Sequence, residues 1–188
     1  MPWWGWTVIA VVVALVVLAV LGYNRLVRLR NEVDTGWANI DVQLRRRADL
    51  IPNLVEAVRG YAAHERAVFD EVTRARAALG EASSPGGAAA ANDELNAALG
   101  RLLAVAEAYP ELKASENFLR LQDDLTDTED KIAAARRYYN TTVMRYNTQI
   151  QSLPWVLVAR ALGFRAREFF SAEGDADVPQ VAFAGSAP

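Results

Sequence analysis

Residues 3–23 read WWGWTVIAVVVALVVLAVLGY, and the first charged side chain of the sequence is Arg25. A helix of this length is about 31 Å long, which matches the roughly 30 Å hydrocarbon core of a bilayer. Apolar side chains lie on every face of such a helix, whereas a helix of a soluble bundle carries one apolar stripe. Tryptophan and tyrosine at the two ends are typical of membrane–water interfaces. The sequence therefore predicts a transmembrane helix, with residues 1–24 as N-terminal tail and anchor.

A cleaved secretory signal is one alternative, and the residues disfavour it. Such a signal has a basic start, a shorter apolar core and small residues at the cleavage site. This sequence starts with Met-Pro-Trp-Trp, and the candidate site at residues 19–22 is flanked by Leu21 and Tyr23. A buried core helix of a soluble protein is the other alternative, which the apolar character on all faces disfavours.

Arginine occurs on one side of the predicted span. Arg25, Arg28 and Arg30 follow it, and no Lys or Arg precedes it. Loops that stay in the cytoplasm are enriched in Lys and Arg. This asymmetry predicts a single-pass protein whose N-terminus lies outside and whose remaining chain is cytoplasmic.

The composition argues against several classes of function. The chain has 20 basic and 23 acidic residues and a formal net charge of −3, so nucleic acid is not an expected partner. It has no cysteine and a single histidine, His64, which leaves no thiol nucleophile and no Ser/His/Asp set. We therefore expect no catalytic residue, no cofactor and no metal site.

Apolar residues after the span recur at alternating steps of three and four, which predicts amphipathic helices. The first stripe comprises Val33, Trp37, Ile40, Leu44, Ala48, Ile51, Val55, Val58, Ala62, Phe69, Val72 and Leu79. Pro52 lies within it. The unbroken phase favours a helix that kinks at Pro52 and continues, whereas the cost of proline inside a helix favours a break.

Residues 81–91 read EASSPGGAAAA and predict a loop, because a proline followed by two glycines is typical of turns. Asn92 or Asp93 then caps the next helix, which ends near Tyr109. A further long helix is predicted from Ser115 to the proline at position 154. Its stripe comprises Phe118, Leu121, Leu125, Thr128, Ile132, Ala135, Tyr139, Val143, Tyr146, Ile150 and Leu153.

The C-terminal part predicts a short helix and a tail. Residues 154–163 can form the short helix, and the phenylalanines at 164, 169 and 170 are apolar enough to pack back. Residues 171–188 are small and acidic and contain Pro and Gly, so we expect disorder there. The expected fold is all-α: an N-terminal transmembrane helix followed by an antiparallel helical bundle over residues 25–170.

Three separated blocks resemble the LemA family, in order along the chain. The first covers residues 36–55 (GWANIDVQLRRRADLIPNLV) and continues through residues 60–65 (GYAAHE). The second covers residues 106–118 (AEAYPELKASENF), and the third joins residues 138–140 (YYN) to residues 146–147 (YN). The resemblance spans about residues 23–170 and includes the anchor.

This resemblance implies a single-pass protein of the bacterial inner membrane with an up-and-down bundle of about four helices facing the cytoplasm. It implies no established enzymatic activity, so no catalytic residue carries over. Some family members are linked to membrane-bound zinc proteases by gene neighbourhood, and one branch takes part in building organelle membranes.

Candidate metal ligands are few. His64 and Glu65 lack the second histidine that a zinc-protease helix needs, because position 68 is Val68, so we expect a surface or capping role. An acidic cluster comprises Asp123, Asp124, Asp127, Glu129 and Asp130. Since it lacks the loop spacing of a calcium site, we expect a solvated or partner-facing helix face, with divalent-ion binding as the alternative.

A basic cluster is formed by Arg45, Arg46 and Arg47, which wind around nearly one helical turn and so point in three directions. Ion pairs with Asp41 and Asp49 at four-residue spacing explain part of it. A phosphate or anionic-lipid site is the alternative.

A Tyr-Asn pair occurs twice at a spacing of seven, as Tyr139–Asn140 and Tyr146–Asn147, which places both tyrosines on the apolar stripe. A buried tyrosine hydroxyl needs a hydrogen-bond partner, and asparagine offers a donor and an acceptor. We expect a polar layer inside the bundle, with an oligomer or ligand contact as the alternative.

These observations favour a membrane-anchored scaffold or adaptor without catalytic activity. Its expected partners are the lipid bilayer and either a membrane protein or a second copy of the chain. One alternative is a membrane-shaping protein that self-assembles, with residues 154–170 lying on the bilayer surface as an interfacial helix. The other is a sensor of small molecules or peptides.

Overall fold

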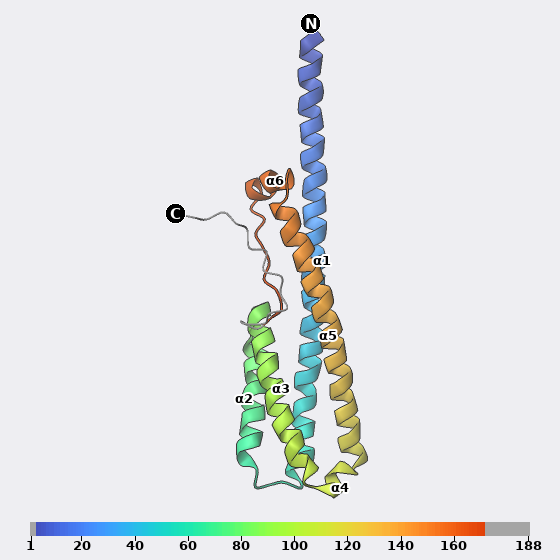
Figure 1. The fold of residues 1–188 in the computed structure, drawn as a ribbon, viewed down its shortest axis with the longest axis vertical. Coiled ribbons are helices and arrows are strands. Elements are labelled where there is room, and N and C mark those ends of the chain that lie inside the picture. The colour runs from blue at the N-terminus through green and yellow to red at the C-terminus, as the bar shows by residue number, and fades with distance from the viewer. Residues whose placement is uncertain (1–2, 172–188) are drawn as a thin grey trace, which may run out of the picture. The chain divides into compact units, whose positions relative to one another are not determined.

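The computed structural model describes residues 3–171, and all regular secondary structure within them is helical. The helices are α1 (Trp3–Arg59), α2 (Arg66–Glu81), α3 (Pro85–Glu107), α4 (Pro110–Lys113), α5 (Glu116–Gln151) and α6 (Trp155–Ala161), as Figure 1 shows. This confirms the all-α prediction. Residues 172–188 of the predicted tail lie outside the described residues.

The chain divides into two compact units, which are described one at a time below. Unit 1 comprises Met1–Asp41 and Ala133–Glu168, and unit 2 comprises Val42–Ile132 and Phe169–Pro188. Helices α1 and α5 each contribute one part to each unit.

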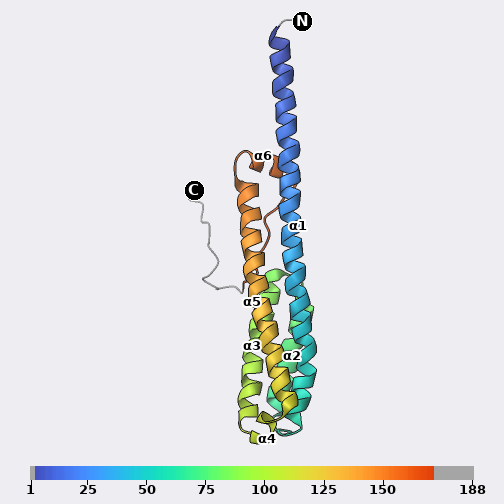
Figure 2. The ribbon, with the colours of Figure 1, turned by 90° about the vertical axis from the view of Figure 1, so that its right-hand side faces the viewer.

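Unit 2 contains four long helical segments that alternate in direction: α1 from Val42, α2, α3, and α5 up to Ile132 (Figures 1 and 2). The single turn α4 connects α3 to α5. The apolar stripes of the long segments face one another, and side chains from three of them are at most 1% exposed: Ile51, Leu54, Val58, Val72, Leu95 and Leu102. The predicted antiparallel up-and-down arrangement of about four helices is present here.

Helix α1 continues through Pro52 to Arg59, so the chain does not break there. Proline has no amide hydrogen, and the carbonyl of Ala48, four residues earlier, therefore lacks its usual helical donor. Nε of Arg76, on α2, donates a hydrogen bond of 2.7 Å to that carbonyl oxygen. The neighbouring helix thus supplies the donor that proline removes, and the apolar stripe keeps its phase across Pro52.

The predicted loop over residues 81–91 is too long: α2 ends at Glu81 and α3 begins at Pro85, so the loop is confined to residues 82–84. The side chain of Ser84 accepts a hydrogen bond of 3.1 Å from the amide of Gly87, which makes Ser84 the N-cap. Proline is favoured in the first turn of a helix, where its missing amide hydrogen costs nothing. Ala88, Ala89 and Ala91 are buried, and Asn92 lies inside the helix instead of capping it.

Unit 1 contains the start of α1, the second part of α5, and α6. Residues 6–21 of α1 are all exposed and apolar except for Thr7, and burial on this helix begins at Gly22 and Leu26. Within the described residues, α1 is the one helix long and apolar enough to cross a membrane. This agrees with the predicted span.

The end of α5 differs in one respect from the expected stripe. Leu153 was expected to be buried, but it is 79% exposed because α5 ends at Gln151 and the helical period stops there. The predicted short helix is present as α6. The expected packing of the phenylalanines holds: in unit 1 the ring of Phe164 makes an edge contact with Tyr23 at 6.1 Å, and in unit 2 Phe170 is buried.

Candidate functional site

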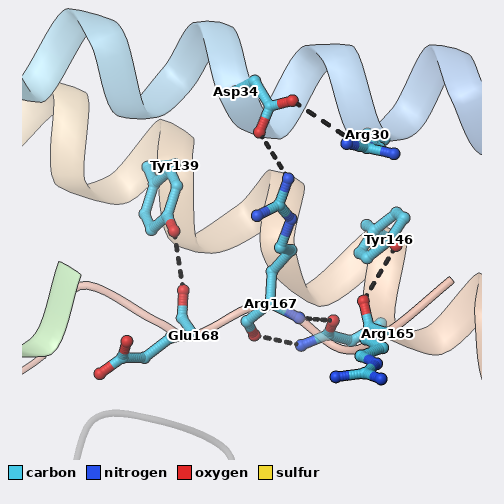
Figure 3. A network of polar contacts seen from close by, with 8 residues as sticks. Arg30, Asp34, Tyr139, Tyr146, Arg165, Arg167 and Glu168 are labelled. Carbon is cyan, nitrogen blue, oxygen red and sulfur yellow. Dashed lines mark hydrogen bonds and ion pairs between the residues drawn. The ribbon is translucent and has the colours of Figure 1, made fainter. Parts of the chain in front are cut away.

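Residues 163–168, which we call the strap, form an irregular segment of unit 1 that is fixed to α5 by side chains (Figure 3). The hydroxyl of Tyr146 donates to the backbone carbonyl of Arg165 at 2.9 Å, and that of Tyr139 donates to the carbonyl of Glu168 at 2.8 Å. Both tyrosines are buried, as the sequence predicted. The two rings therefore hold the strap along two turns of α5.

Asn147 and Arg167 form the centre of this arrangement. The Asn147 amide nitrogen donates to the carbonyl of Arg167 at 2.9 Å, and its Oδ1 accepts from the Arg167 amide at 2.8 Å. The Arg167 guanidinium binds Asp34 of α1 at 2.8 Å, and Arg30 lies 3.9 Å from the same carboxylate (Figure 3). The strap is thus bonded to both long helices of unit 1.

The environment of the tyrosines raises their pKa. Burial raises the pKa of Tyr139 to about 12, with a smaller opposing effect from Arg167. Burial also raises the pKa of Tyr146 above its ordinary value. Both hydroxyls stay protonated at neutral pH and act as donors, which suits their backbone acceptors.

The partners of these tyrosines differ from the prediction, which gave that role to neighbouring asparagines. The acceptors are backbone carbonyls 19 and 29 residues further along the chain. The Tyr-Asn spacing correctly indicated a polar layer. It carried no signal for the strap, because a backbone acceptor has no side-chain pattern.

The second polar centre lies in unit 2 around Arg47, which is 3% exposed. Its Nη1 donates to Oδ1 of Asn92 at 3.0 Å, and its Nη2 donates to Oε2 of Glu129 at 3.1 Å. Burial lowers the pKa of this guanidinium, and the carboxylate of Glu129 acts in the opposite direction. Arg47 thus joins α1 to α3 and α5.

Neighbouring Arg46 points elsewhere, as the helical turn predicted. Its guanidinium lies 3.7 Å from Asp127 and 3.9 Å from Asp124 on α5. Asp124 and Asp127 are thus partners of Arg46, and Glu129 is the acidic partner of Arg47. The basic cluster therefore serves helix packing at two of its three positions.

The acidic cluster is partly neutralised within unit 2. Besides the pairs with arginine, the Asp127 carboxylate accepts a hydrogen bond of 2.7 Å from Lys131. This hydrogen bond, together with the positive charges of Lys131 and Arg46, lowers the pKa of Asp127. Asp123 and Asp130 are exposed, so a solvated acidic face remains beside these pairs.

An open groove of about 420 Å³ lies next to Arg47. Its wall is formed by residues of α3 and α5: Asn96, Leu99, Gly100, Leu103, Gln122, Leu125, Thr126, Glu129 and Asp130. Nε of Arg47 and Oδ1 of Asn96 are buried and have no hydrogen-bond partner among the described residues. The groove thus has apolar walls and an acidic rim, with one unpaired donor and one unpaired acceptor buried in residues of its wall, which suits an amide-bearing or cationic group.

His64 lies in the turn between α1 and α2, is exposed, and its backbone carbonyl accepts from the amide of Arg66. Within residues 3–171, no three His, Cys, Asp or Glu side chains gather in a way that could hold a metal ion. The polar centres described above join helices; they do not assemble a nucleophile with a base.

The fold and the exposed apolar part of α1 define an all-helical, membrane-associated protein. The sequence profile of the LemA family matches residues 36–183, and the chain belongs to this family. The family is not known for enzymatic activity. The match begins at residue 36, where the first resembling block of the sequence begins.

Individual relatives support this assignment. Magnetosome protein MamQ 2 of Paramagnetospirillum magneticum is 28% identical over 194 residues, covering 89% of this chain and 71% of the relative. Magnetosome protein MamQ of Magnetospirillum gryphiswaldense is 27% identical over 193 residues, with the same coverage. Protein LemA of Metamycoplasma hominis is 27% identical over 143 residues, covering 74% of this chain and 64% of the relative.

Proposed function

We propose that this chain is a single-pass scaffold or adaptor of the bacterial inner membrane and has no catalytic role. One observation carries the proposal: α1 is a continuous helix whose residues 6–21 are exposed and, apart from Thr7, apolar, and whose later residues carry a buried stripe. A helix of this kind can cross a bilayer and still form part of a helical bundle.

The proposed orientation places the N-terminus outside and the bundle in the cytoplasm. The support is the charge asymmetry of the sequence, since Arg25, Arg28 and Arg30 follow the span. A reporter that is active only in the cytoplasm, fused after Phe170, should be active. Activity of a reporter that requires the periplasm at the same position would refute the orientation.

The proposed docking face of the scaffold is the groove beside Arg47. Buried polar atoms without partners are rare in proteins and cost roughly 1–3 kcal/mol each. A partner segment that presents an amide would, after a small movement of the groove wall, give an acceptor to Nε of Arg47 and a donor to Oδ1 of Asn96. A cation on that segment would pair with the acidic rim. The groove also carries exposed positions, such as Thr126, from which a partner can be captured.

Photocrosslinking in native membranes tests this face. A benzophenone amino acid replaces Thr126 at the groove, and the matched control replaces exposed Ala77 on α2. We expect a defined adduct with a membrane protein from position 126 and none from position 77. Equal patterns from the two positions would refute the groove as docking face.

A second candidate function, a membrane-shaping protein that self-assembles, is favoured by the similarity to proteins named for the magnetosome. The same experiment separates the two candidates. Adducts made of two copies of this chain support self-assembly, whereas adducts with a different membrane protein support the adaptor.

A further inference from the structure

The segment around α6 exposes three leucines within ten residues of sequence. Leu153 is 79% exposed, Leu157 67% and Leu162 54%. A single exposed leucine is ordinary on a protein surface, but a cluster on one short segment marks a surface that contacts something apolar. The opposite side of α6 packs inward through Ala159, which is 2% exposed.

The position of α6 along α1 is fixed by Trp155. Its indole ring lies on the backbone of Gly22, and a Cβ atom at position 22 would overlap that ring. Gly22 is buried, whereas each of residues 6–21 before it is exposed. Packing against α1 therefore begins with α6, directly after the apolar run ends (Figure 1).

The length of the apolar run places this contact at the edge of a bilayer. Residues 3–21 rise about 28 Å as a helix, close to the roughly 30 Å of a hydrocarbon core. When they span that core, Gly22 lies at its boundary. Trp155 then lies in the interfacial zone, which tryptophan favours, and α6 lies at the same level.

The charged side chains of unit 1 near this level are basic, which suits the anionic surface of a membrane. Arg25 and Arg28 follow the span, and Arg160 and Arg165 are exposed on and after α6. Residues 152–167 contain no Asp or Glu. A surface with exposed leucines and arginines matches the acyl chains and the anionic phosphates of a lipid leaflet.

We propose that α6, together with Leu153 and Leu162, is an interfacial foot that lies on the leaflet from which α1 emerges. Its leucines insert among acyl chains at the level that the contact between Trp155 and Gly22 sets. The proposal rests on the proposed membrane span of α1, and it adds a second, non-spanning contact with the same bilayer.

Single cysteines in the full chain test this foot, since the natural sequence has none. The chain is reconstituted in vesicles of phosphatidylcholine and phosphatidylglycerol with Leu157→Cys, with Met144→Cys on α5 as water-exposed control, and with Val12→Cys as reference inside the span. Reaction with a water-soluble maleimide is followed. We expect Leu157→Cys to react at least about tenfold more slowly than Met144→Cys, because Leu153, Leu162 and Trp155 still hold the segment on the bilayer and the thiol spends little time in water.

The three positions separate the possible failures. Reaction of Leu157→Cys as fast as Met144→Cys, with Val12→Cys protected, overturns the foot and leaves the span intact. Rapid reaction at Val12→Cys overturns the span and the proposed membrane scaffold with it. A spin label at position 157 should also collide with oxygen more than with a nickel chelate; protection from both would show that protein covers the site, which overturns the lipid contact.

The role of Gly22 is tested in the same vesicles. Gly22→Leu pushes Trp155 away, whereas Gly5→Leu is a matched control because a Cβ at position 5 meets no atom within 4 Å. We expect Gly22→Leu to raise the reactivity of Leu157→Cys several-fold and Gly5→Leu to leave it unchanged. Equal reactivity in both variants would show that this contact does not set the level of α6.

Discussion

The hydrogen bond between Arg76 and the carbonyl of Ala48 should matter because Pro52 is present. In an uninterrupted helix the amide of residue 52 would donate to that carbonyl, and proline cannot. The Nε of Arg76 takes over at 2.7 Å. The effect of losing Arg76 should therefore depend on the residue at position 52.

The expected loss of stability in Arg76→Ala follows from the chemistry of the donor. A hydrogen bond from a charged group contributes about 1.5–3 kcal/mol, and a polar group left without a partner costs about 1–3 kcal/mol. Arg76 is partly exposed, so water can replace it in part. We expect Arg76→Ala to lower the free energy of unfolding by about 1.5–2.5 kcal/mol in the natural chain, and by about 0.5–1 kcal/mol in Pro52→Ala.

A double-mutant cycle measures this dependence. Urea unfolding of the full chain in detergent, followed by circular dichroism, gives the four free energies of unfolding. The expected coupling between positions 52 and 76 is about 1–1.5 kcal/mol. Arg74→Ala is the control, because Nε of Arg74 donates to the carbonyl of Asp70 within its own helix.

If Arg76→Ala lowers the free energy of unfolding equally with proline and with alanine at position 52, Arg76 does not replace the donor that proline removes. Sites without shared partners add to within about 0.5 kcal/mol, so a coupling below that value would mean that Arg76 contributes by packing alone. A coupling of similar size between positions 52 and 74 would also refute this role of Arg76, because Nε of Arg74 bonds within α2 and, among the described residues, Arg74 has no bond to α1.

Three further predictions concern the polar centres. Asn147→Ala removes both hydrogen bonds to the Arg167 backbone, so amide hydrogen exchange in the strap should rise about five- to thirtyfold, as expected for a loss of about 1–2 kcal/mol. Unchanged exchange would show that Asn147 does not hold the strap. Burial raises the pKa of Tyr139 in the folded chain to about 12, so its protonated hydroxyl stabilises the fold by about 2–3 kcal/mol below about pH 10, and this stabilisation is lost as the pH rises toward 12. Tyr139→Phe should therefore flatten the pH dependence of the urea midpoint. Arg47→Ala should lower the free energy of unfolding by about 2–4 kcal/mol, since it removes charged hydrogen bonds and buried packing, while Asp127→Ala should leave the unfolding midpoint unchanged; equal effects would contradict the assignment of Arg47 to the core.

The helices could be predicted because their determinants repeat along the sequence. An apolar residue every three or four positions identified the buried faces of α1, α2 and α5, and the uniformly apolar run identified the exposed part of α1. The residues around Pro52 alone allow two predictions, a helix that continues and a helix that breaks. The donor that decides it, Arg76, is 28 residues away.

The start of α3 differs from the predicted loop because the composition of residues 81–91 and the order of its residues indicate different structures. Proline and glycine in residues 81–91 are typical of loops when taken as a set. Ser84 directly before Pro85 is also an N-cap followed by a first-turn proline, and that order of residues was a usable signal. The strap cannot be predicted from the sequence for a different reason: its hydrogen bonds to α5 involve its own backbone atoms, which leave no side-chain pattern.

The strap and α6 depend on each other physically. A helix of seven residues is far below the roughly 12 residues at which an isolated helix becomes even marginally stable, so α6 needs contacts at both ends. Trp155 on Gly22 supplies the first. At the other end Gly163, with φ of 72° in the left-handed region that glycine favours, turns the chain into the strap. Tyr146 and Asn147 then fix the strap to α5, so the Tyr-Asn motif holds in place the helix that we propose to lie on the membrane.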